Sequence, residues 1–467
     1  MKKPTLIIKL RQNIPLIIIL LIALFLRLYN LQYMEFKGDE AFNSIKALKF
    51  VNEGEIPLFS SIGTTGIHEP PIFIYLLSIP YLFSKNPVIA AGFIALLNAF
   101  GILICYLLVK KFYNKRAAII SSAFYAASPW QILFSRKIWA QDLLAFFAIV
   151  FLYFIFNAIY EKKKSHLIYA LATLGILIQI HLSALYFFPV AAIALAANYK
   201  KLNEKIKNFS SIKSTKYFLY NENKKYLFIG IILFLLSFSP YFAFQIKNNF
   251  ADIRTALELA KKDTAFHSSA FIIPFTLVST KGFEPLFGTD FNDFGNTALR
   301  ISFFDIFAMA MLFLSIAFLF SYTKKSSILI LWLVIGTLFL AFSKVEAIDA
   351  HYFASFFPLY FIIIGNMLDI FIKAMHKKIK PVVYLLIILT LAYQIAFNIS
   401  FLSFIEKSQC INGDYGMPYQ HRLNNMEKTM DKFETTNTDI REINELSCNC
   451  AKCDILAAEF MLMHIKN

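Results

Sequence analysis

The chain consists mostly of apolar runs of about 20 residues that alternate with short polar connections. An α-helix needs a run of this length to cross the roughly 30 Å hydrocarbon core of a bilayer. The pattern therefore predicts an all-α polytopic membrane protein with about 11 transmembrane helices. The predicted spans are residues 13–31, 87–109, 117–134, 139–160, 166–182, 183–198, 226–246, 301–321, 327–343, 352–372 and 381–403.

The composition supports this class. Of 467 residues, 58% are hydrophobic and 52 are Phe, an apolar content that a soluble domain does not carry. Lys2, Lys3, Lys9 and Arg11 precede the first apolar run as in a signal peptide, but no small-residue cleavage motif follows it. We therefore expect the first run to remain as an uncleaved span.

The charged residues predict an orientation. Lysine-rich connections at residues 110–116, 162–164, 199–225, 324–325 and 373–380 all fall on one side of the predicted bundle. Because positive loops stay in the cytoplasm, we expect a cytoplasmic N-terminus and an extracytoplasmic C-terminus in the plasma membrane. The same distribution explains the net charge of +16 without a nucleic-acid partner.

The spans divide the chain into two parts. We expect residues 1–403 to form a membrane domain with outer loops at 32–86 and 247–300, and residues 404–467 to form a small extracytoplasmic tail. The apolar spacing that follows residue 39 predicts an amphipathic helix of the first outer loop on the membrane surface, with a second apolar helix after it.

The tail contains four of the five cysteines: Cys410, Cys448, Cys450 and Cys453. A Cys-x-Cys-x-x-Cys cluster is compatible with zinc, but no His lies at ligand spacing, and thiols in an oxidising compartment usually pair. We therefore expect two disulfides, whose pairing the spacing does not reveal.

The stretch Phe36-Lys37-Gly38-Asp39-Glu40-Ala41 places two adjacent carboxylates just beyond the first span. An N-cap role would explain Asp39 but would leave Glu40 without a role. Ionisable residues at a membrane boundary, beside a loop that can fold over a cavity, usually serve function. We interpret Asp39 and Glu40 as catalytic acids on the outer face.

A second polar stretch, residues 135–142, lies at the outer end of the third and fourth predicted spans. Lys137 and Trp139 are also explained as interfacial anchors. Placing the Asp142 carboxylate near the start of a span would cost free energy if it had no partner. Arg136 is either that partner or a ligand of phosphate, because its planar guanidinium binds two oxygens.

Further polar residues are predicted on the same side: His68, Glu69, His181, Lys344, His351 and Tyr352. The span interiors are almost free of charge, whereas transporters place charged residues near the bilayer midplane. This contrast favours an interfacial enzyme over a flippase or transporter of lipid-linked saccharides. No cofactor is indicated, and no ligand spacing demands a metal, although a divalent ion is compatible with the acids and histidines present.

Several motifs, taken in chain order, resemble those of the GT-C glycosyltransferases, specifically the superfamily of protein O-mannosyltransferases and lipid A aminoarabinose transferases. They are Arg27-Leu28, Gly38-Asp39-Glu40-Ala41, Pro70-Pro71, Arg136…Asp142, His181-x-Ser183 and His351-Tyr352-Phe353…Pro358. Together they extend over most of residues 20–365.

The resemblance implies a sugar on a polyprenyl phosphate as donor and inverting transfer on the outer face to a hydroxyl of a lipid, glycan or protein. It implies that Asp39 is the general base and that Glu40 orients the acceptor or tunes Asp39. Arg136, with Lys137 and His181, would hold the donor phosphate. Asp142, Glu69, His68, Lys344, His351 and Tyr352 would support the site.

One residue differs from the pattern of the aminoarabinose branch. The aminoarabinose branch tends to carry a lysine before Pro-Pro, where this chain has Glu69. We therefore expect a mannose-like hexose as the transferred sugar. In the tail, Gly413-Asp414-Tyr415-Gly416 looks like an element near the cavity, with no role assigned.

Overall fold

The computed structural model describes residues 6–207, 213–262, 265–320, 326–432 and 455–466, and the single positions 440, 444 and 447. These residues are mostly helical, and the extended pairs among them are isolated bridges such as Glu35 with Pro418. The prediction of an all-α protein is confirmed.

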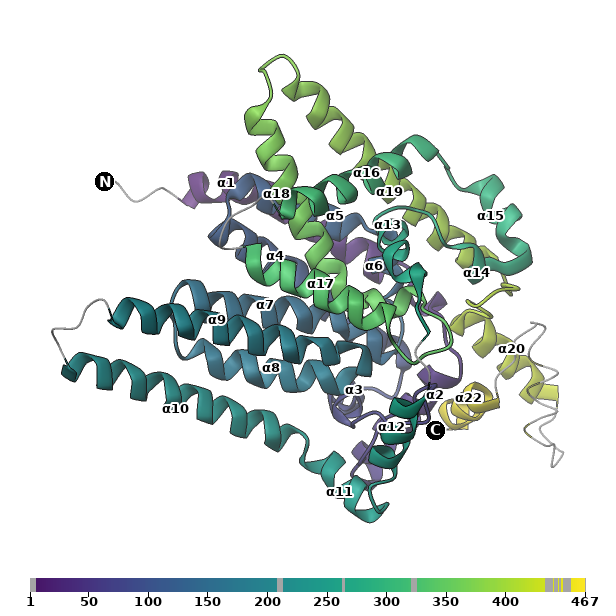
Figure 1. The fold of residues 1–467 in the computed structure, drawn as a ribbon. Coiled ribbons are helices and arrows are strands. Elements are labelled where there is room, and N and C mark those ends of the chain that lie inside the picture. The colour runs from purple at the N-terminus through teal and green to yellow at the C-terminus, as the bar shows by residue number, and fades with distance from the viewer. Residues whose placement is uncertain are drawn as a thin grey trace.

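A bundle of apolar helices forms the body of the molecule (Figure 1). Its helices are α1 (Leu6–Leu28), α4 (Pro87–Phe112), α5 (Lys115–Ala127), α7 (Leu144–Tyr160), α8 (His166–Ile180), α9 (Phe187–Lys207), α10 (Lys213–Ser237), α11 (Ser239–Lys247), α16 (Ser302–Leu319), α17 (Ser327–Ala341), α18 (Phe357–Ala374) and α19 (Lys380–Lys407).

Among the described residues, five helical segments are by themselves long and apolar enough to cross a membrane. They are Pro87–Phe112, Ala140–Tyr160, Ser302–Leu319, Ala350–Ala374 and Lys380–Lys407. The pair Lys224–Ser237 and Ser239–Lys247, bent by 45°, makes a sixth if it is one span. The spans predicted at 13–31, 166–182, 183–198 and 327–343 are shorter apolar helices, and the one predicted at 117–134 is broken, so the number of 11 spans stays a prediction.

Proline and extended residues break several predicted spans near one end of the bundle. The span expected at 117–134 divides into α5 and α6 (Pro129–Leu133), because Pro129 disfavours helical backbone at Ser128. The span expected at 166–182 ends at Ile180, since His181 is extended. Irregular backbone at membrane depth is tolerated where it is buried in protein or lines a cavity.

Short helices gather at the end of the bundle that faces away from the N-terminus (Figure 1). They are α2 (Gly38–Glu53), α3 (Ile72–Tyr81), α12 (Ala251–Lys261), α13 (Ile273–Leu277), α14 (Glu284–Phe287), α15 (Phe291–Thr297), α20 (Tyr419–Lys432) and α22 (Ile455–Lys466). Single 3₁₀ turns connect them and the bundle: η1 (Leu31–Tyr33), η2 (Ala140–Leu143), η3 (Leu182–Tyr186), η4 (Ser268–Phe271), η5 (Gly288–Asp290) and η7 (Ala350–Phe356).

The helix predicted after residue 39 is present as α2, and it packs against α3 and against α22 of the tail. Phe36, which precedes α2, contacts Phe460 of α22 with ring centroids 5.1 Å apart. The tail is therefore docked on the first outer loop.

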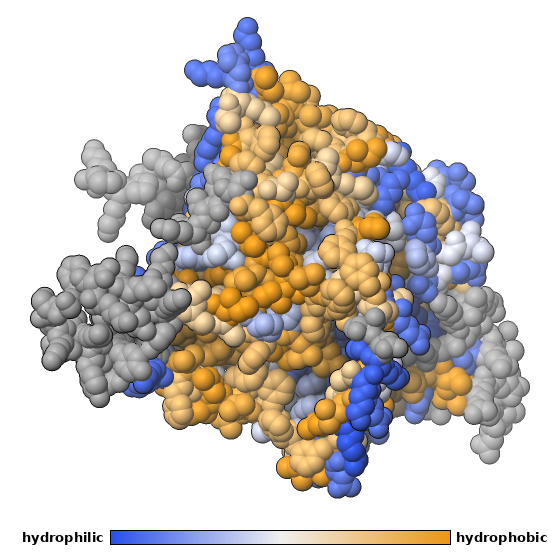
Figure 2. Space-filling view, in the orientation of Figure 1, coloured by the Kyte–Doolittle hydropathy of each residue, from blue (hydrophilic) through white to orange (hydrophobic). Residues whose placement is uncertain are grey.

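The bundle surface is apolar. Figure 2 shows a broad hydrophobic face over the helices, with hydrophilic residues gathered toward its edges. Large side chains such as Phe228, Phe313 and Ile388 are 64%, 62% and 60% exposed. Because such a surface would be unstable in water, the chain is a multi-pass membrane protein, and the side on which each terminus lies stays a prediction.

Of the cysteines, Cys105 is free and buried in α4. Cys410 is disulfide-bonded. Cys448, Cys450 and Cys453 lie outside the described residues, so the predicted pairing is not tested.

Candidate active site

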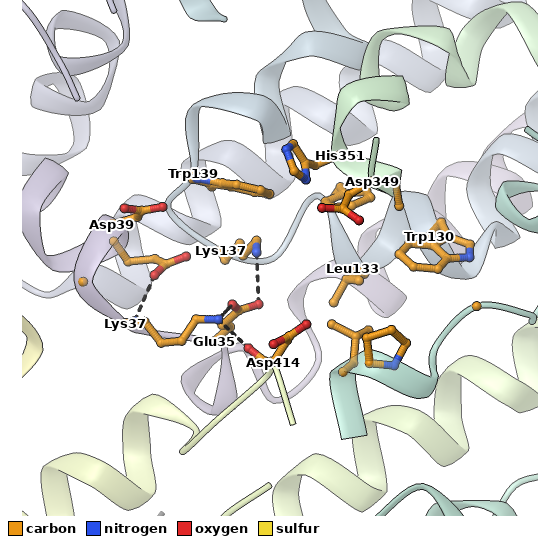
Figure 3. Close-up of a pocket in the computed structure, with 17 residues that line it drawn as sticks. Glu35, Lys37, Asp39, Trp130, Leu133, Lys137, Trp139, Asp349, His351 and Asp414 are labelled. Atoms are coloured by element: carbon orange, nitrogen blue, oxygen red, sulfur yellow. Dashed lines mark hydrogen bonds and ion pairs between the residues drawn. The ribbon is translucent and has the colours of Figure 1, made fainter. Parts of the chain in front are cut away.

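A cavity of about 490 Å³ opens among the short helices (Figure 3). This volume is within the usual range for small-molecule sites, roughly 300–1,000 Å³. Five separate parts of the chain line it: the first outer loop, the segment 130–139, residues 282–286, residues 349–351 and the tail. The polar groups of the lining are Glu35, Lys37, Asp39, Glu40, Lys137, Asp349, His351 and Asp414, and its large aromatic groups are Trp130, Phe134 and Trp139.

Asp39 lies in the first turn of α2, and its side chain is exposed to the cavity. It is not the N-cap, because α2 begins at Gly38 and the capping position is Lys37. Within the described part of the chain its carboxylate makes no hydrogen bond or ion pair, and Figure 3 shows it without contacts to the neighbouring side chains drawn. An unpaired carboxylate at a cavity wall is available to accept a proton from a bound molecule.

Glu40 has the capping role that the sequence had suggested for Asp39. Its buried side chain reaches back to the start of α2, where a carboxylate oxygen accepts the Lys37 N–H at 2.9 Å. This contact is half of a capping box. Burial, followed by the charge of Glu35, raises the pKa of Glu40 to about 7.

Lys137 extends toward the cavity and forms an ion pair with Glu35 at 3.0 Å. Its ammonium lies 4.2 Å from the centre of the Trp139 ring, so the predicted interfacial tryptophan is a wall of the site. Burial alone would lower the pKa of Lys137, but the charges of Glu35, Glu40 and Asp142 together outweigh it and raise this pKa. Lys137 is therefore a permanent cation in the cavity.

Arg136 does not line the cavity. It is 5% exposed, and its guanidinium donates to the carbonyls of Leu26 at 3.0 Å, Tyr29 at 2.8 Å and Asn30 at 3.2 Å. The carbonyls of Leu26 and Tyr29 lie at the end of α1, where carbonyls lack helical partners and carry partial negative charge, which a buried cation stabilises. The Asn30 carbonyl also accepts the Tyr33 N–H at 3.1 Å. The geometry thus does not support the predicted roles of Arg136 as a ligand of phosphate or as the partner of Asp142.

Arg27 likewise donates hydrogen bonds to carbonyls at the end of a helix, in this case α5. It is fully buried in α1 and donates to Ala126 O at 3.1 Å and Tyr125 O at 3.4 Å, at the end of α5. The two arginines therefore hold together the helix ends beneath the cavity.

Replacing Arg136 by Met is expected to lower the free energy of unfolding by roughly 3 kcal/mol, because buried carbonyls lose a charged donor. Thermal unfolding of the protein in detergent measures this loss. The matched control is Arg254→Met, at an exposed arginine of α12, which should change stability by less than about 0.5 kcal/mol. An Arg136→Met protein of normal stability that cannot bind a polyprenyl phosphate would restore the phosphate-binding role.

His181 is part of a second polar cluster behind the cavity. Its Nδ1 accepts the Ser183 N–H at 3.2 Å, and its Nε2 lies 3.4 Å from Glu69. Glu69 also accepts a hydrogen bond from Ser61 at 2.8 Å. His181 does not line the cavity, so its predicted contact with a donor phosphate has no support in this geometry.

The cluster reaches the cavity through His351, whose ring lies 5.0 Å from that of Trp139 and 4.1 Å from that of Tyr352. Burial raises the pKa of Glu69 to about 7, and the charge of Asp39 adds to this shift. Glu69 and His351 therefore stand where the sequence predicted supporting residues, close to the cavity wall.

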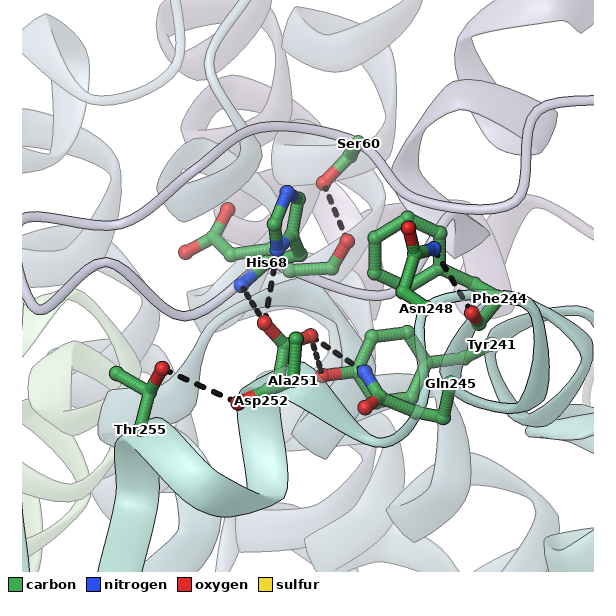
Figure 4. A network of polar contacts seen from close by, with 10 residues as sticks. Ser60, His68, Tyr241, Phe244, Gln245, Asn248, Ala251, Asp252 and Thr255 are labelled. Atoms are coloured by element: carbon green, nitrogen blue, oxygen red, sulfur yellow. Dashed lines mark hydrogen bonds and ion pairs between the residues drawn. The ribbon is translucent and has the colours of Figure 1, made fainter. Parts of the chain in front are cut away.

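His68 and Lys344 are remote from the cavity lining. His68 Nδ1 lies within hydrogen-bonding distance of the Asp252 carboxylate, at 2.8 Å. Figure 4 shows the two side chains facing each other. Asp252 also accepts hydrogen bonds from Tyr241 at 2.7 Å and from Gln245, so it joins the first outer loop to the α11–α12 junction. Lys344 donates to the Lys262 carbonyl. Both residues hold outer segments together and do not contact the site.

Asp142 lies buried behind the cavity, near enough to Lys137 to add to its positive pKa shift. The backbone carbonyl of Asp142 accepts a hydrogen bond from Asn98 at 2.9 Å. Asp142 therefore supports the cavity wall from within the protein, and its side chain does not face the cavity.

The tail completes one wall of the cavity. Asp414 lines it, and its N–H donates to Pro285 O at 2.8 Å, followed by Tyr415 N–H to Leu286 O at 3.1 Å. A Cβ at Gly413 would lie 2.4 Å from Leu286 O, so only glycine permits this approach. Lys37 donates to the Asp414 carbonyl from the opposite side.

Glu35 and Asp414 are lining residues to which the sequence interpretation assigned no role. Each belongs to an acidic outer segment, but nothing in the sequence indicates that the tail meets residue 35. Among the described residues, no group of three or more His, Cys, Asp or Glu side chains is arranged to hold a metal ion.

Comparisons with known proteins agree on one fold. Residues 68–213 match the family model described as dolichyl-phosphate-mannose-protein mannosyltransferase. ArnT from Cupriavidus metallidurans, solved with bound undecaprenyl phosphate, superposes with a TM-score of 0.57 at 12% identity, covering 91% of this chain and 81% of ArnT. No curated protein sequence is significantly similar.

A second similar structure is the archaeal oligosaccharyltransferase AglB from Archaeoglobus fulgidus, solved with an inhibitory peptide and a dolichol-phosphate. Its TM-score is 0.53 at 15% identity, covering 97% of this chain and 61% of AglB. The chain therefore spans less than two thirds of that enzyme. Together the comparisons confirm the recognition of a GT-C glycosyltransferase fold of the mannosyltransferase and ArnT type.

Proposed function

We propose that this protein, a membrane protein of the GT-C glycosyltransferase type, transfers a mannose-like hexose from a polyprenyl phosphate to a hydroxyl acceptor on the outer face of the membrane. The observation that carries the proposal is the single cavity that contains both the unpaired Asp39 carboxylate and the Lys137 ammonium. One group can take up a proton and the other can stabilise a leaving phosphate.

In the proposed reaction, Asp39 accepts the proton of the acceptor hydroxyl as its oxygen attacks the anomeric carbon of the sugar. A new glycosidic bond forms while the bond between that carbon and the phosphate oxygen breaks, and attack from the opposite side inverts the configuration. A hydroxyl is a poor nucleophile, and a positioned base typically contributes 10²- to 10⁴-fold.

The leaving polyprenyl phosphate gains negative charge as its bond to the sugar breaks. Lys137, buried between Glu35 and the Trp139 ring, is placed to stabilise this charge. Because the cation is held before the reaction begins, its stabilisation is greatest in the transition state. Of the three residues that the resemblance had assigned to the donor phosphate, we therefore keep Lys137 alone in this role.

The similar structures support the kind of donor that we propose. ArnT and AglB were solved with undecaprenyl phosphate and dolichol-phosphate, respectively, and a polyprenyl phosphate is therefore the donor carrier we propose. The family model at residues 68–213 supports mannose as the first sugar to test. The acceptor is a hydroxyl of a lipid, a glycan or a protein.

Reconstitution in sealed vesicles tests the function. Purified protein is supplied with radiolabelled polyprenyl-phosphate mannose and a membrane extract as the acceptor source, and the label is followed into a new glycoside. We expect the label in a product that resists mild acid, which cleaves sugar phosphates. Movement of labelled donor across the vesicle membrane, with no glycosidic bond formed, would instead identify a flippase or transporter.

A further inference from the structure

The two cations of the cavity are already paired with one carboxylate. Glu35 extends one oxygen to Lys37 at 2.5 Å and the other to Lys137 at 3.0 Å (Figure 3). The carboxylate is buried, with the whole residue 4% exposed. It therefore bridges two lysines that lie 100 positions apart, one from the first outer loop and one from the segment after α6.

No other cation lines the cavity among the described residues. The remaining charged groups of the lining are acidic, and Asp39, Asp349 and Asp414 all face the same space. An anion that enters the cavity therefore meets a net negative field unless it contacts Lys37 or Lys137. Both lysines are ion-paired with Glu35.

We propose that Glu35 is an internal competitor of the donor phosphate: it pairs with the two lysines and is displaced from at least Lys137 when a polyprenyl phosphate binds. This inference rests on the proposed function. A carboxylate and a phosphate each present two acceptor oxygens to the same pair of ammonium groups, so one can replace the other.

The backbone around Glu35 is held in place by the tail. Glu35 pairs with Pro418 of the tail in an isolated bridge, and the next contact, Tyr419 N–H to Met34 O at 3.0 Å, fixes the chain on its other side. Burial alone would raise the pKa of Glu35, but Lys137 and Lys37 together outweigh it and hold this pKa below its usual value. The Glu35 side chain is therefore ionised.

The arrangement has a consequence for turnover. Buried lysines without a counter-ion would bind the product phosphate tightly, because the attraction between charges is strong where water is excluded. A carboxylate that returns to the lysines weakens the product complex and helps the polyprenyl phosphate to leave. Glu35 is thus a positioning residue that acts through Lys37 and Lys137 and sets the affinity of the site.

Replacing Glu35 by Gln tests the competition. The dissociation constant of farnesyl phosphate, a short polyprenyl phosphate, is measured by titration calorimetry for both proteins in detergent. We expect Glu35→Gln to bind this probe about tenfold more tightly, since two cations lose their internal anion. A residue with only a structural role would weaken binding when replaced.

Three further variants define the result. Asp349→Asn removes one charge from the same cavity at a carboxylate that contacts neither lysine, and should change the affinity less than about threefold. Glu35→Asp retains the charge and should also stay within about threefold of the parent protein. Glu35→Ser provides a second neutral variant with the same expected gain if Glu35→Gln does not fold.

The outcomes separate the two proposals. If the parent protein binds farnesyl phosphate and neither neutral variant binds it more tightly, the competition is wrong while the proposed function stands. An equal gain in Asp349→Asn or in Glu35→Asp would also overturn it, because net charge or packing would then be the cause. If the parent protein and both neutral variants fail to bind the probe, the polyprenyl-phosphate site itself is wrong and both proposals fall.

Discussion

Replacing Asp39 by Asn is expected to reduce sugar transfer by about 10³-fold while binding of the polyprenyl-phosphate donor survives. Asparagine has the shape of aspartate but accepts no proton at neutral pH, so the acceptor hydroxyl would have to attack without a base. The loss should appear in kcat, since Asp39 makes no contact with the described residues that its replacement would break. Transfer of labelled sugar and equilibrium binding of the donor are measured on the same preparation.

Two variants of the same helix are the controls. Glu40→Gln removes the neighbouring carboxylate but leaves a side chain that also caps α2 at this position, so it reveals whether Glu40 shares the role of base. Glu53→Gln changes an exposed acid at the other end of α2 and should leave transfer unchanged. Full activity of Asp39→Asn would show that the base lies elsewhere, and a loss confined to Glu40→Gln would assign it to Glu40.

Replacing Lys137 by Gln is expected to weaken binding of a polyprenyl phosphate at least about tenfold and to slow transfer by about 10²- to 10³-fold. The cation supports the phosphate most strongly as charge develops on it, so the rate should fall more than the affinity. Steady-state kinetics with variable donor concentration separates the two effects. Thermal unfolding checks that Glu35, still paired with Lys37, does not destabilise the variant.

Lys281→Gln is the matched control for charge. Lys281 lies next to the cavity, where its carbonyl accepts the Trp130 indole N–H at 2.9 Å, but its side chain is absent from the lining. The same loss of charge there should change donor affinity less than about threefold. If Lys137→Gln binds and transfers normally, the leaving phosphate must be stabilised by another group, and the proposed mechanism is wrong.

Much of the helical fold could be predicted from hydrophobic runs. The span expected at 381–403 lies within α19 and the span at 87–109 within α4, because a long apolar run in a membrane has helix as its main solution. The breaks were harder to predict. His181 and Ser128 interrupt apolar segments that read as continuous, and these interruptions shape the backbone around the site.

For the candidate site, the sequence correctly brought Asp39, Glu40 and Lys137 to one region. Of the two adjacent cations that it assigned to the donor phosphate, Lys137 lines the cavity and Arg136 does not. Arg136 and Lys137 are adjacent and equally charged, and they follow a helix that ends at Leu133, so no periodicity indicates which of them points inward. The carbonyls at the end of α1 are ligands for Arg136 only because α1 and α6 meet in three dimensions.

The sequence by itself determined that the protein is helical and membrane-embedded, since these properties depend on local apolar length. It also located the Asp39-Glu40 pair beyond the first span. The tertiary structure alone decided that Glu40 caps a helix while Asp39 is unpaired, and that Glu35 bridges Lys37 and Lys137. It also showed that Asp414, in the tail segment that the sequence had suggested near the cavity, lines the cavity wall. The pair of Glu35 and Lys137 joins residues 102 positions apart. The energies of these contacts depend on burial and distance, which a single sequence does not encode locally.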